Sequence, residues 1–276
     1  MNLEALPYAV LLILAEFSVG SLIAVLFVDA RGMAPSSYVK LSAGIVAVAA
    51  SLMLLSALNV SSIDLEGYRL KDGMFGPVRT FAAGFFAISL VYCVLAFRQE
   101  RERSLLVGGL GAIVGVIMIG LLAYQVSPPT WGFPGPLSSL LVGTLALGFV
   151  SEAMLLGHWY LVSPKMAGRP MEETTAVLFG VMVLQALLLI VNAAIPVREA
   201  PETAAVLAGS LASNPAFWLR VGVGLLFPLA LAFMAWRSSL EYSMMSATGL
   251  LYIAVGGVFV GEVLARGLLF VTGAAV

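Results

Sequence analysis

The sequence predicts an all-α, polytopic membrane protein with eight transmembrane helices. Hydrophobic residues make up 61% of the 276 residues and charged residues 11%, whereas a soluble domain carries about 25% charged residues. Eight apolar runs are each close to or above the ~20 residues that a helix needs to cross ~30 Å of hydrocarbon. The runs are continuous rather than alternating, which favours helices over barrel strands. These observations exclude a soluble globular protein.

The expected spans follow one another from the amino terminus. The first run has no basic residues before it and is longer than the apolar core of a signal peptide, so we expect it to be retained. Glycine, proline and serine in residues 31–37 then interrupt the apolar pattern. The spans are expected at residues 6–28, 39–60, 78–97, 105–126, 137–162, 175–195, 216–236 and 246–271.

The later runs are also bounded by polar or proline-rich connections. Residues 61–77 are rich in charge and glycine, residues 98–103 read Arg-Gln-Glu-Arg-Glu-Arg, and residues 127–134 hold three prolines. The remaining breaks are residues 163–173, residues 197–215 and a short turn near residues 237–241. No break is long enough for a separate soluble domain, so a soluble catalytic or redox partner would be a different polypeptide.

The basic residues near the span ends predict the orientation. The side reached after spans one, three, five and seven carries eight lysines and arginines, and the opposite side carries six. Because the more basic side faces the cytoplasm, we expect a multi-pass protein of the inner (cytoplasmic) membrane with both termini on the outer face. The eight are Arg31, Lys40, Arg98, Arg101, Arg103, Lys165, Arg169 and Arg237.

Charge and composition exclude several partners and sites. Fourteen basic residues against fifteen acidic ones, with no basic patch, exclude nucleic acid as a partner. Cys93 is the single cysteine and His158 the single histidine, so we expect no disulfide and no protein-bound metal. A haem ligated by His158 together with a different kind of residue stays an open alternative.

An internal repeat is indicated by two connections. Residues 96–104 align without gaps on residues 235–243 and share the pattern Ala-aromatic-Arg-x-x-x-Glu-x-Ser. Each copy lies between the third and fourth spans of a half, which predicts two tandem four-helix units, residues 1–126 and 127–276. Ligands favour the seams between such units. The alternative is that short membrane connections share these residue types without a duplication.

Three carboxylates are predicted at membrane depth. Glu16, Glu152 and Glu262 lie near the middle of the first, fifth and eighth spans, where a charged side chain costs roughly 2.5–3.5 kcal/mol. Arg266 follows Glu262 by one helical turn, which indicates a structural ion pair. Glu16 and Glu152 have no base within one turn. Each is therefore either a proton-transfer residue or a hydrogen-bonded carboxyl that joins helices.

Four other polar residues are candidates for binding a quinone. His158 and Tyr160 lie near a membrane interface, where an aromatic belt also explains the tyrosine. The imidazole suits a quinone carbonyl, a proton exchange or a plain polar contact. Gln185 and Asn192 share one face of the sixth span, and that face is expected to meet protein rather than lipid.

Two arginines and one proline complete the analysis of the spans. Arg79 and Arg220 lie near the starts of spans three and seven, where we expect them to extend to the interface. Pro228 is the only midspan proline, and Ser89 is its counterpart in span three. Matched helix breaks would favour a transporter, so this asymmetry counts against one.

Two segments and the topology resemble a known family. Residues 14–22, Leu-Ala-Glu-Phe-Ser-Val-Gly-Ser-Leu, look like the first helix of NrfD/polysulfide-reductase-type membrane subunits, a group that includes the anchor of dimethyl sulfoxide reductase. Residues 64–69, Asp-Leu-Glu-Gly-Tyr-Arg, look like that family's Asp-Leu-Gly-Arg turn, with Glu66 inserted and no proline after the base. The arrangement in two four-helix halves is similar as well.

The resemblance implies a subunit of a respiratory complex that is not catalytic alone. Such a subunit anchors a peripheral iron–sulfur or cytochrome subunit in membrane lipid, exchanges electrons with membrane quinone and binds no metal itself. The family also suggests proton paths within the bundles, which would give Glu16 and Glu152 a role. The alternative is a secondary transporter or ion-coupled permease that uses the same carboxylates. An intramembrane enzyme would need paired carboxylates or a histidine-rich motif, and the sequence has neither.

Overall fold

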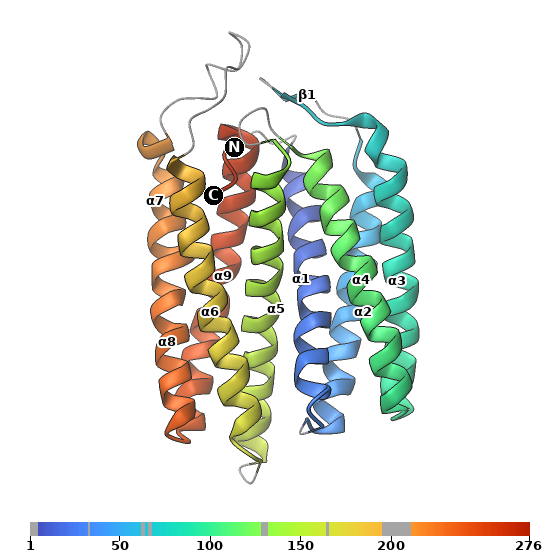
Figure 1. Cartoon of the computed structure of the whole chain (residues 1–276), viewed down its shortest axis with the longest axis vertical. Coiled ribbons are helices and arrows are strands. Elements are labelled where there is room, and N and C mark those ends of the chain that lie inside the picture. The colour runs from blue at the N-terminus through green and yellow to red at the C-terminus, as the bar shows by residue number, and fades with distance from the viewer. Residues whose placement is uncertain are drawn as a thin grey trace.

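The long helices form a bundle whose axes run nearly parallel (Figure 1). The computed structural model describes residues 5–32, 34–61, 64–65, 68–127, 132–163, 166–194 and 211–276. Within these residues, eight helical segments of 24 to 29 residues are long and apolar enough to cross a membrane. The predicted fold class, an all-α polytopic membrane protein, is confirmed.

The first half of the chain contains four long helices and a small hairpin. The helices are α1 (Leu6–Asp29), α2 (Ser36–Asn59), α3 (Phe75–Phe97) and α4 (Arg101–Gln125). Between α2 and α3 lie the antiparallel strands β1 (Asp64–Leu65) and β2 (Tyr68–Arg69), followed by the 3-10 turn η2 (Asp72–Met74).

The second half contains four more spans, one of which is interrupted. Its helices are α5 (Pro134–Val162), α6 (Arg169–Ala194), α7 (Pro215–Val221), α8 (Phe227–Leu240) and α9 (Met244–Thr272). A 3-10 turn, η4 (Leu211–Ser213), precedes α7, and a π-helical segment, η5 (Gly222–Leu226), joins α7 to α8. Thus α7, η5 and α8 together form the seventh span.

All eight predicted spans overlap observed helices, and several helices extend beyond the apolar run. The sixth span was expected to begin at residue 175, but α6 begins at Arg169, where an Arg169–Glu173 ion pair of 2.6 Å supports the first turn. Residue 195, the expected end of that span, lies outside the described residues, as do Lys165 and residues 66–67 of the family-like turn. Arg198, one of the six basic residues counted on the opposite side, lies outside them as well.

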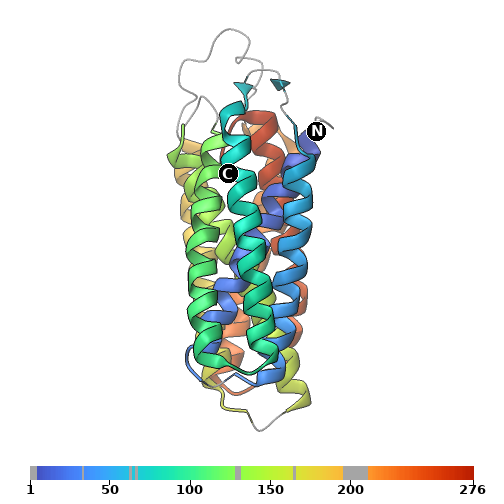
Figure 2. The ribbon, with the colours of Figure 1, turned by 90° about the vertical axis from the view of Figure 1, so that its right-hand side faces the viewer.

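The long helices form two groups with the same order of neighbours. In the first half α1 contacts α2 and α4, and α3 lies between those two. In the second half α5 contacts α6 and α9, and α8 lies between those two. The halves meet mainly where α1 packs against α5, and Figure 2 shows the bundle from the side of the first half. This order is what a tandem duplication would give, and the duplication itself stays a prediction.

The seam between α1 and α5 depends on two glycines. A Cβ atom on Gly20 would lie 1.9 Å from the Thr144 carbonyl oxygen, and one on Gly148 would lie 2.1 Å from the Gly20 carbonyl carbon. The two backbones are therefore in contact, as small residues allow between membrane helices. This crossing brings the helices that carry Glu16 and Glu152 together.

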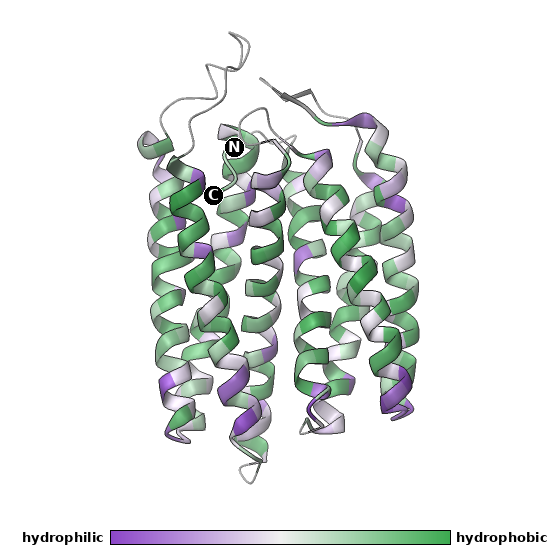
Figure 3. Ribbon diagram, in the orientation of Figure 1, coloured by the Kyte–Doolittle hydropathy of each residue, from purple (hydrophilic) through white to green (hydrophobic). Residues whose placement is uncertain are grey.

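The outside of the bundle is apolar along the length of the helices. Large hydrophobic side chains such as Val48, Ile113 and Ile190 are at least 60% exposed, and Figure 3 shows hydrophilic residues concentrated at the two ends of the helices. A soluble protein rarely exposes such a continuous apolar surface. The surface fits a multi-pass membrane protein surrounded by lipid.

Candidate functional site

Two groups of buried polar side chains lie inside the bundle. The first lies toward the end that holds the chain termini, because Ser139 and Arg220 are near the starts of α5 and α7 and both helices begin at that end (Figure 1). We call it the arginine–glutamate cluster; its members are Glu16, Ser139, Gln185, Arg220, Glu262 and Arg266.

Arg266 is the centre of the arginine–glutamate cluster. Its Nη2 atom lies 2.6 Å from Glu16 Oε1 and 2.8 Å from Glu262 Oε2, and its Nε atom donates to Glu16 Oε2 at 3.1 Å. Nη1 donates to the Ser139 hydroxyl at 3.0 Å. One guanidinium therefore joins α9 to α1 and α5. The expected Glu262–Arg266 pair is present, and it is part of a larger assembly.

Glu262 also receives two donors on its other oxygen. Gln185 Nε2 of α6 donates to Oε1, and Arg220 Nη2 of α7 lies 3.4 Å from the same atom. Glu16, Glu262, Arg220 and Arg266 are each no more than 1% exposed. Two acids and two arginines have no net charge when all are ionised, and such pairing is what makes buried charges tolerable.

Arg220 is buried beside the interruption of the seventh span. The prediction that it extends to the interface is wrong, since it is 1% exposed. Pro228 has no N–H, and its ring opposes the carbonyl four residues earlier, that of Gly224. That carbonyl, in the π-helical segment η5, accepts a hydrogen bond from Arg220 Nη1 at 2.9 Å. Arg79, in contrast, donates to the Ala57 and Val60 carbonyls at the end of α2.

Gly143 provides the space for the charged atoms. A Cβ atom at this position of α5 would lie 2.6 Å from Glu16 Oε1, 2.6 Å from Glu262 Oε2 and 2.7 Å from Arg266 Nη2. Any side chain here would displace the ion pairs. No sequence pattern distinguishes Gly143 from the other glycines of the spans.

Two atoms of the arginine–glutamate cluster have no hydrogen-bond partner among the described residues. They are Gln185 Oε1, an acceptor, and Arg220 Nε, a donor. Buried polar atoms are nearly always satisfied by protein or by ordered water. An unsatisfied acceptor and an unsatisfied donor beside the same carboxylate could therefore bind water or a polar ligand.

The second group surrounds Glu152 and lies toward the opposite end. We call it the Glu152 cluster; its members are Tyr38, Ser42 and Glu152. The hydroxyls of Tyr38 and Ser42 donate to Glu152 Oε2 at 2.9 and 2.6 Å. Glu152 Oε1 has no partner, and none of the described arginines, lysines or histidines forms an ion pair with this carboxyl. Glu152 is fully buried.

The candidate quinone residues fall into two separate places. His158 Nδ1 lies 3.1 Å from the Tyr252 hydroxyl, and the Tyr160 hydroxyl donates to the Ala167 carbonyl. Both histidine and tyrosine lie near the end of α5, and that end is remote from the chain termini (Figure 1).

Gln185 and Asn192 lie in the second part of α6, toward the termini. Gln185 belongs to the arginine–glutamate cluster, whereas Asn192 Nδ2 donates to the Ala275 carbonyl. Both side chains are buried, at 6% and 5% exposed. The structure thus brings Gln185 together with Glu16 but does not bring either amide to His158 and Tyr160.

Comparison with known proteins does not extend these assignments. No protein-family model matches the chain, and no curated protein sequence matches it. The described residues contain no group of three or more His, Cys, Asp or Glu side chains that could hold a metal ion. The function must therefore be argued from the two buried clusters.

Proposed function

We propose that this chain is the integral membrane subunit of a multi-subunit electron-transfer complex, that it anchors a peripheral iron–sulfur or cytochrome subunit, and that it exchanges electrons and protons with membrane quinone. The observation that carries the proposal is the arginine–glutamate cluster with its two unpartnered atoms. Intramembrane ionisable groups that face the bundle interior usually mark a path for a substrate, an ion or a proton.

The unpartnered atoms fit the polar head of a quinone. Arg220 Nε can donate a hydrogen bond to a quinone carbonyl, and Gln185 Oε1 can accept one from a quinol hydroxyl. Both side chains also contact Glu262 Oε1. A carboxylate in this place can accept a proton that quinol releases on oxidation, and Glu16 shares Arg266 with it.

An apolar groove supports access from the lipid. A groove of about 430 Å³ follows the outer face of α2 and includes Leu14 and Phe17 of α1, a volume within the usual range for small-molecule sites. Phe17 is the residue after Glu16, and its ring packs against Phe259 of α9 at 5.5 Å between centroids. An isoprenoid tail in this groove would contact Phe17, the residue that follows Glu16 of the cluster.

The redox centres would belong to a partner. The single cysteine and single histidine cannot ligate an iron–sulfur cluster, so the electrons of quinol must pass to carriers on another polypeptide. The described connections between helices are short, which leaves the ends of the bundle accessible for a peripheral subunit.

The test compares two amides of the same helix. In the intact complex, Gln185→Leu removes the unpartnered acceptor, and we expect the KM for quinol to rise roughly tenfold, the loss of about 1.4 kcal/mol of binding. Asn192→Leu is the matched control: it also removes an unpartnered amide oxygen, but its amide donates to the Ala275 carbonyl outside the arginine–glutamate cluster, so the KM should stay unchanged. His158→Ala should also leave it unchanged, because the imidazole is remote from the cluster. An unchanged KM in Gln185→Leu, or a purified protein without any redox subunit or quinol activity, would refute the proposal.

One observation favours the alternative of an ion-coupled permease. The π-helical segment η5 interrupts the seventh span next to the charged cluster, and transporters often bind substrate at interrupted helices. In α3, the corresponding helix of the first half, the described span is continuous. Within the described residues, α3 and the seventh span therefore do not share a matched helix break, and this favours the electron-transfer proposal. If proteoliposomes that contain this chain alone took up a solute in response to a proton gradient, the permease would be supported instead.

A further inference from the structure

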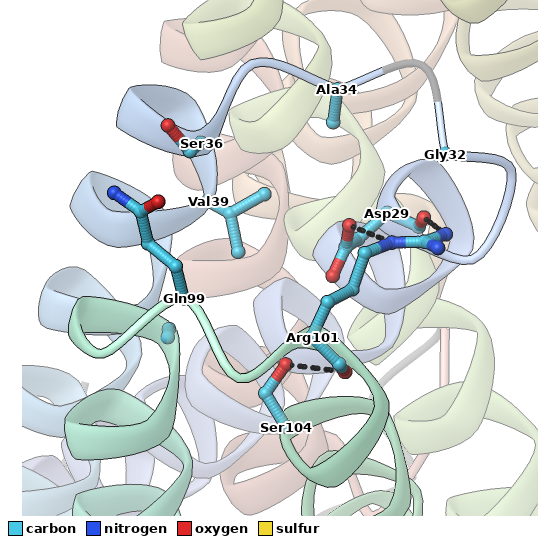
Figure 4. Close-up of a pocket in the computed structure, with 9 residues that line it drawn as sticks. Asp29, Gly32, Ala34, Ser36, Val39, Gln99, Arg101 and Ser104 are labelled. Carbon is cyan, nitrogen blue, oxygen red and sulfur yellow. Dashed lines mark hydrogen bonds and ion pairs between the residues drawn. The ribbon is translucent and has the colours of Figure 1, made fainter.

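A polar pocket opens at the end of the bundle that is remote from the chain termini. It has a volume of about 220 Å³ and lies between the α1–α2 and α3–α4 connections (Figure 4). One side is the Asp29–Arg101 ion pair, with 3.1 Å between Asp29 Oδ1 and Arg101 Nε. Gln99 and Ser36 lie on the other side in Figure 4, and both are exposed and uncharged. We call this cavity the Asp29–Gln99 pocket.

The pocket adjoins the apolar groove on the outer face of α2, which we call the α2 groove. Val39 of α2 and Ala96 of α3 line the pocket and are buried. The next residues along the same helices, Lys40 and Phe97, line the groove. The edge where α2 packs against α3 therefore has a polar cavity on its inner side and an apolar one on its outer side. A ligand with a polar head and an apolar tail fits this arrangement.

The α2 groove is about as long as one lipid leaflet is thick. Leu52 follows Lys40 by 12 residues, a rise of about 18 Å along the helix, and half of the hydrocarbon thickness is about 15 Å. Val48, which lines the groove between them, is 60% exposed. A Cβ atom on Gly44 would meet nothing within 4 Å, so the groove is open at this residue. An acyl chain from the leaflet at this end can therefore lie along α2.

The head of the groove carries positive charge without a counter-ion. Lys40 is the one charged residue among the described residues that line the groove. It forms no ion pair within the described part of the chain, whereas Arg31, Arg101 and Arg103 at this end are each paired with an acid. Arg98, the residue after α3, likewise has no ion pair with a described residue. This end of the groove is therefore complementary to an anion.

We propose that the α2 groove and the Asp29–Gln99 pocket together bind one anionic phospholipid. The Lys40 ammonium binds the phosphate, one acyl chain lies along α2, and the hydroxyls of a small headgroup reach Gln99 and Ser36 at the rim of the pocket. A choline headgroup fits less well, because its quaternary ammonium would lie close to Arg98 and Arg101. The lipid is thus an anionic one with a hydroxylated headgroup, such as phosphatidylglycerol.

The inference goes beyond the proposed function, because it concerns the basic end of the bundle and requires no quinone. An isoprenoid tail that entered the same groove from the Phe17 side would compete with the acyl chain. The competing explanation is that Lys40 only extends to the interface and that any lipid covers the groove. The two explanations differ in whether the groove prefers one headgroup.

Fluorescence quenching measures which lipid occupies the groove. In a Cys93→Ser background, Val48→Cys carries a small fluorophore, and the full chain is placed in phosphatidylcholine vesicles with a fixed fraction of phosphatidylglycerol or phosphatidylcholine that is brominated on its acyl chains. Ile113→Cys on α4 is the matched control. Both residues follow the first residue of their helix by 12 positions, and they are 60% and 61% exposed.

We expect phosphatidylglycerol to associate at Val48 about fivefold more strongly than phosphatidylcholine, the effect of one lysine beside an anionic lipid. At Ile113 the two lipids should quench nearly equally. Lys40→Gln should abolish the preference at Val48, and Lys40→Arg should keep it, because the positive charge remains. Gln99→Ala should lower it roughly twofold, since it removes one neutral hydrogen bond to the headgroup.

Arg237→Gln is the control for charge. Arg237 is an exposed base at the same end of the bundle but in the second half, so its loss should leave the preference at Val48 unchanged. Thermal unfolding should also stay unchanged in Lys40→Gln and Arg237→Gln, because neither side chain forms an ion pair within the described residues. A lost preference in Lys40→Gln is then not a lost fold.

Three results would each overturn the inference: equal association of the two lipids at Val48, the same preference at Ile113 as at Val48, or a preference that survives Lys40→Gln. An unchanged preference in Gln99→Ala would overturn the role of the pocket. None of these measurements uses quinol, so the failure of the lipid site is distinguishable from the failure of the proposed function.

Discussion

Arg266 can hold two carboxylates because its guanidinium presents several donors in a fixed plane. Nε and Nη2 bind both oxygens of Glu16, and Nη2 also reaches Glu262. A lysine ammonium offers a single point charge on a flexible stem and could not reproduce this geometry. Arg266 also balances the charge of the cluster, since its loss would leave two buried acids with one arginine.

Removing Arg266 should therefore be costly unless an acid is removed with it. We expect Arg266→Met to destabilise the protein by about 3–5 kcal/mol, as for other broken buried pairs. Arg266→Met combined with Glu16→Gln should recover a large part of this loss, because the remaining Arg220–Glu262 pair has no net charge. Thermal unfolding in detergent for the two single variants and the double variant measures the coupling. A double variant whose loss equals the sum of the single losses would contradict the charge-balance account.

A second residue-scale prediction concerns Gly143. A methyl group there would lie 2.6 Å from two carboxylate oxygens, so Gly143→Ala should destabilise the protein by about 1–3 kcal/mol through overpacking. Gly109→Ala is the matched control, because a Cβ atom at that helical position meets nothing within 4 Å. The control should be neutral or slightly stabilising when thermal unfolding in detergent is measured for both variants. Equal changes in stability for the two variants would show that the ion pairs move to accommodate the methyl group at no cost.

At the scale of elements, the π-helical segment η5 links backbone geometry to the site. Pro228 removes one backbone donor from the seventh span, and the Gly224 carbonyl that it leaves free accepts from Arg220. The residues Arg220, Gly224 and Pro228 are spaced four apart and lie along one face. This spacing was visible in the sequence and could have predicted that Arg220 turns inward.

Pro228→Ala should restore a regular helix. With an N–H at position 228, the Gly224 carbonyl can take its ordinary intrahelical donor, and the amides of Gly222–Leu226 should exchange with deuterium more slowly. Mass spectrometry of the exchanged protein measures this directly. Pro170→Ala is the control, because Pro170 lies in the first turn of α6, where its missing N–H interrupts no helical bond. Unchanged exchange at η5 would assign the π-helical geometry to its glycines instead.

At the scale of the whole molecule, the fold was predictable and the site only partly so. The length and continuity of apolar runs determine a membrane helix, so the eight spans could be placed from the sequence alone. Ion pairs within one turn were visible, as for Glu262 and Arg266. The partner of Glu16 was not, because Arg266 is 250 residues away. Spacing along one helix carries no information about contacts between distant helices.

The two halves also depend on each other electrostatically. Glu16 is the only member of the arginine–glutamate cluster that comes from residues 1–126, and the other five come from residues 127–276. Separated halves would leave Glu16 without a cation and leave two arginines with a single acid. Burial of unpaired charge in lipid is unfavourable, so association should be favoured by both packing at Gly20 and this ion pair.

We therefore expect residues 1–126 and 127–276, expressed together as two chains, to assemble into one complex. Each half has its own group of four contacting spans, and the α1–α5 seam joins them. Affinity purification through a tag on one half should recover the other from detergent. Glu16→Gln should lower the recovery of the second half, because that half then keeps an arginine without a balancing acid. Glu152→Gln in α5 is the comparison and should lower recovery less, since that carboxyl forms no ion pair among the described residues. Equal recovery with and without Glu16 would mean that the seam is held by glycine packing alone.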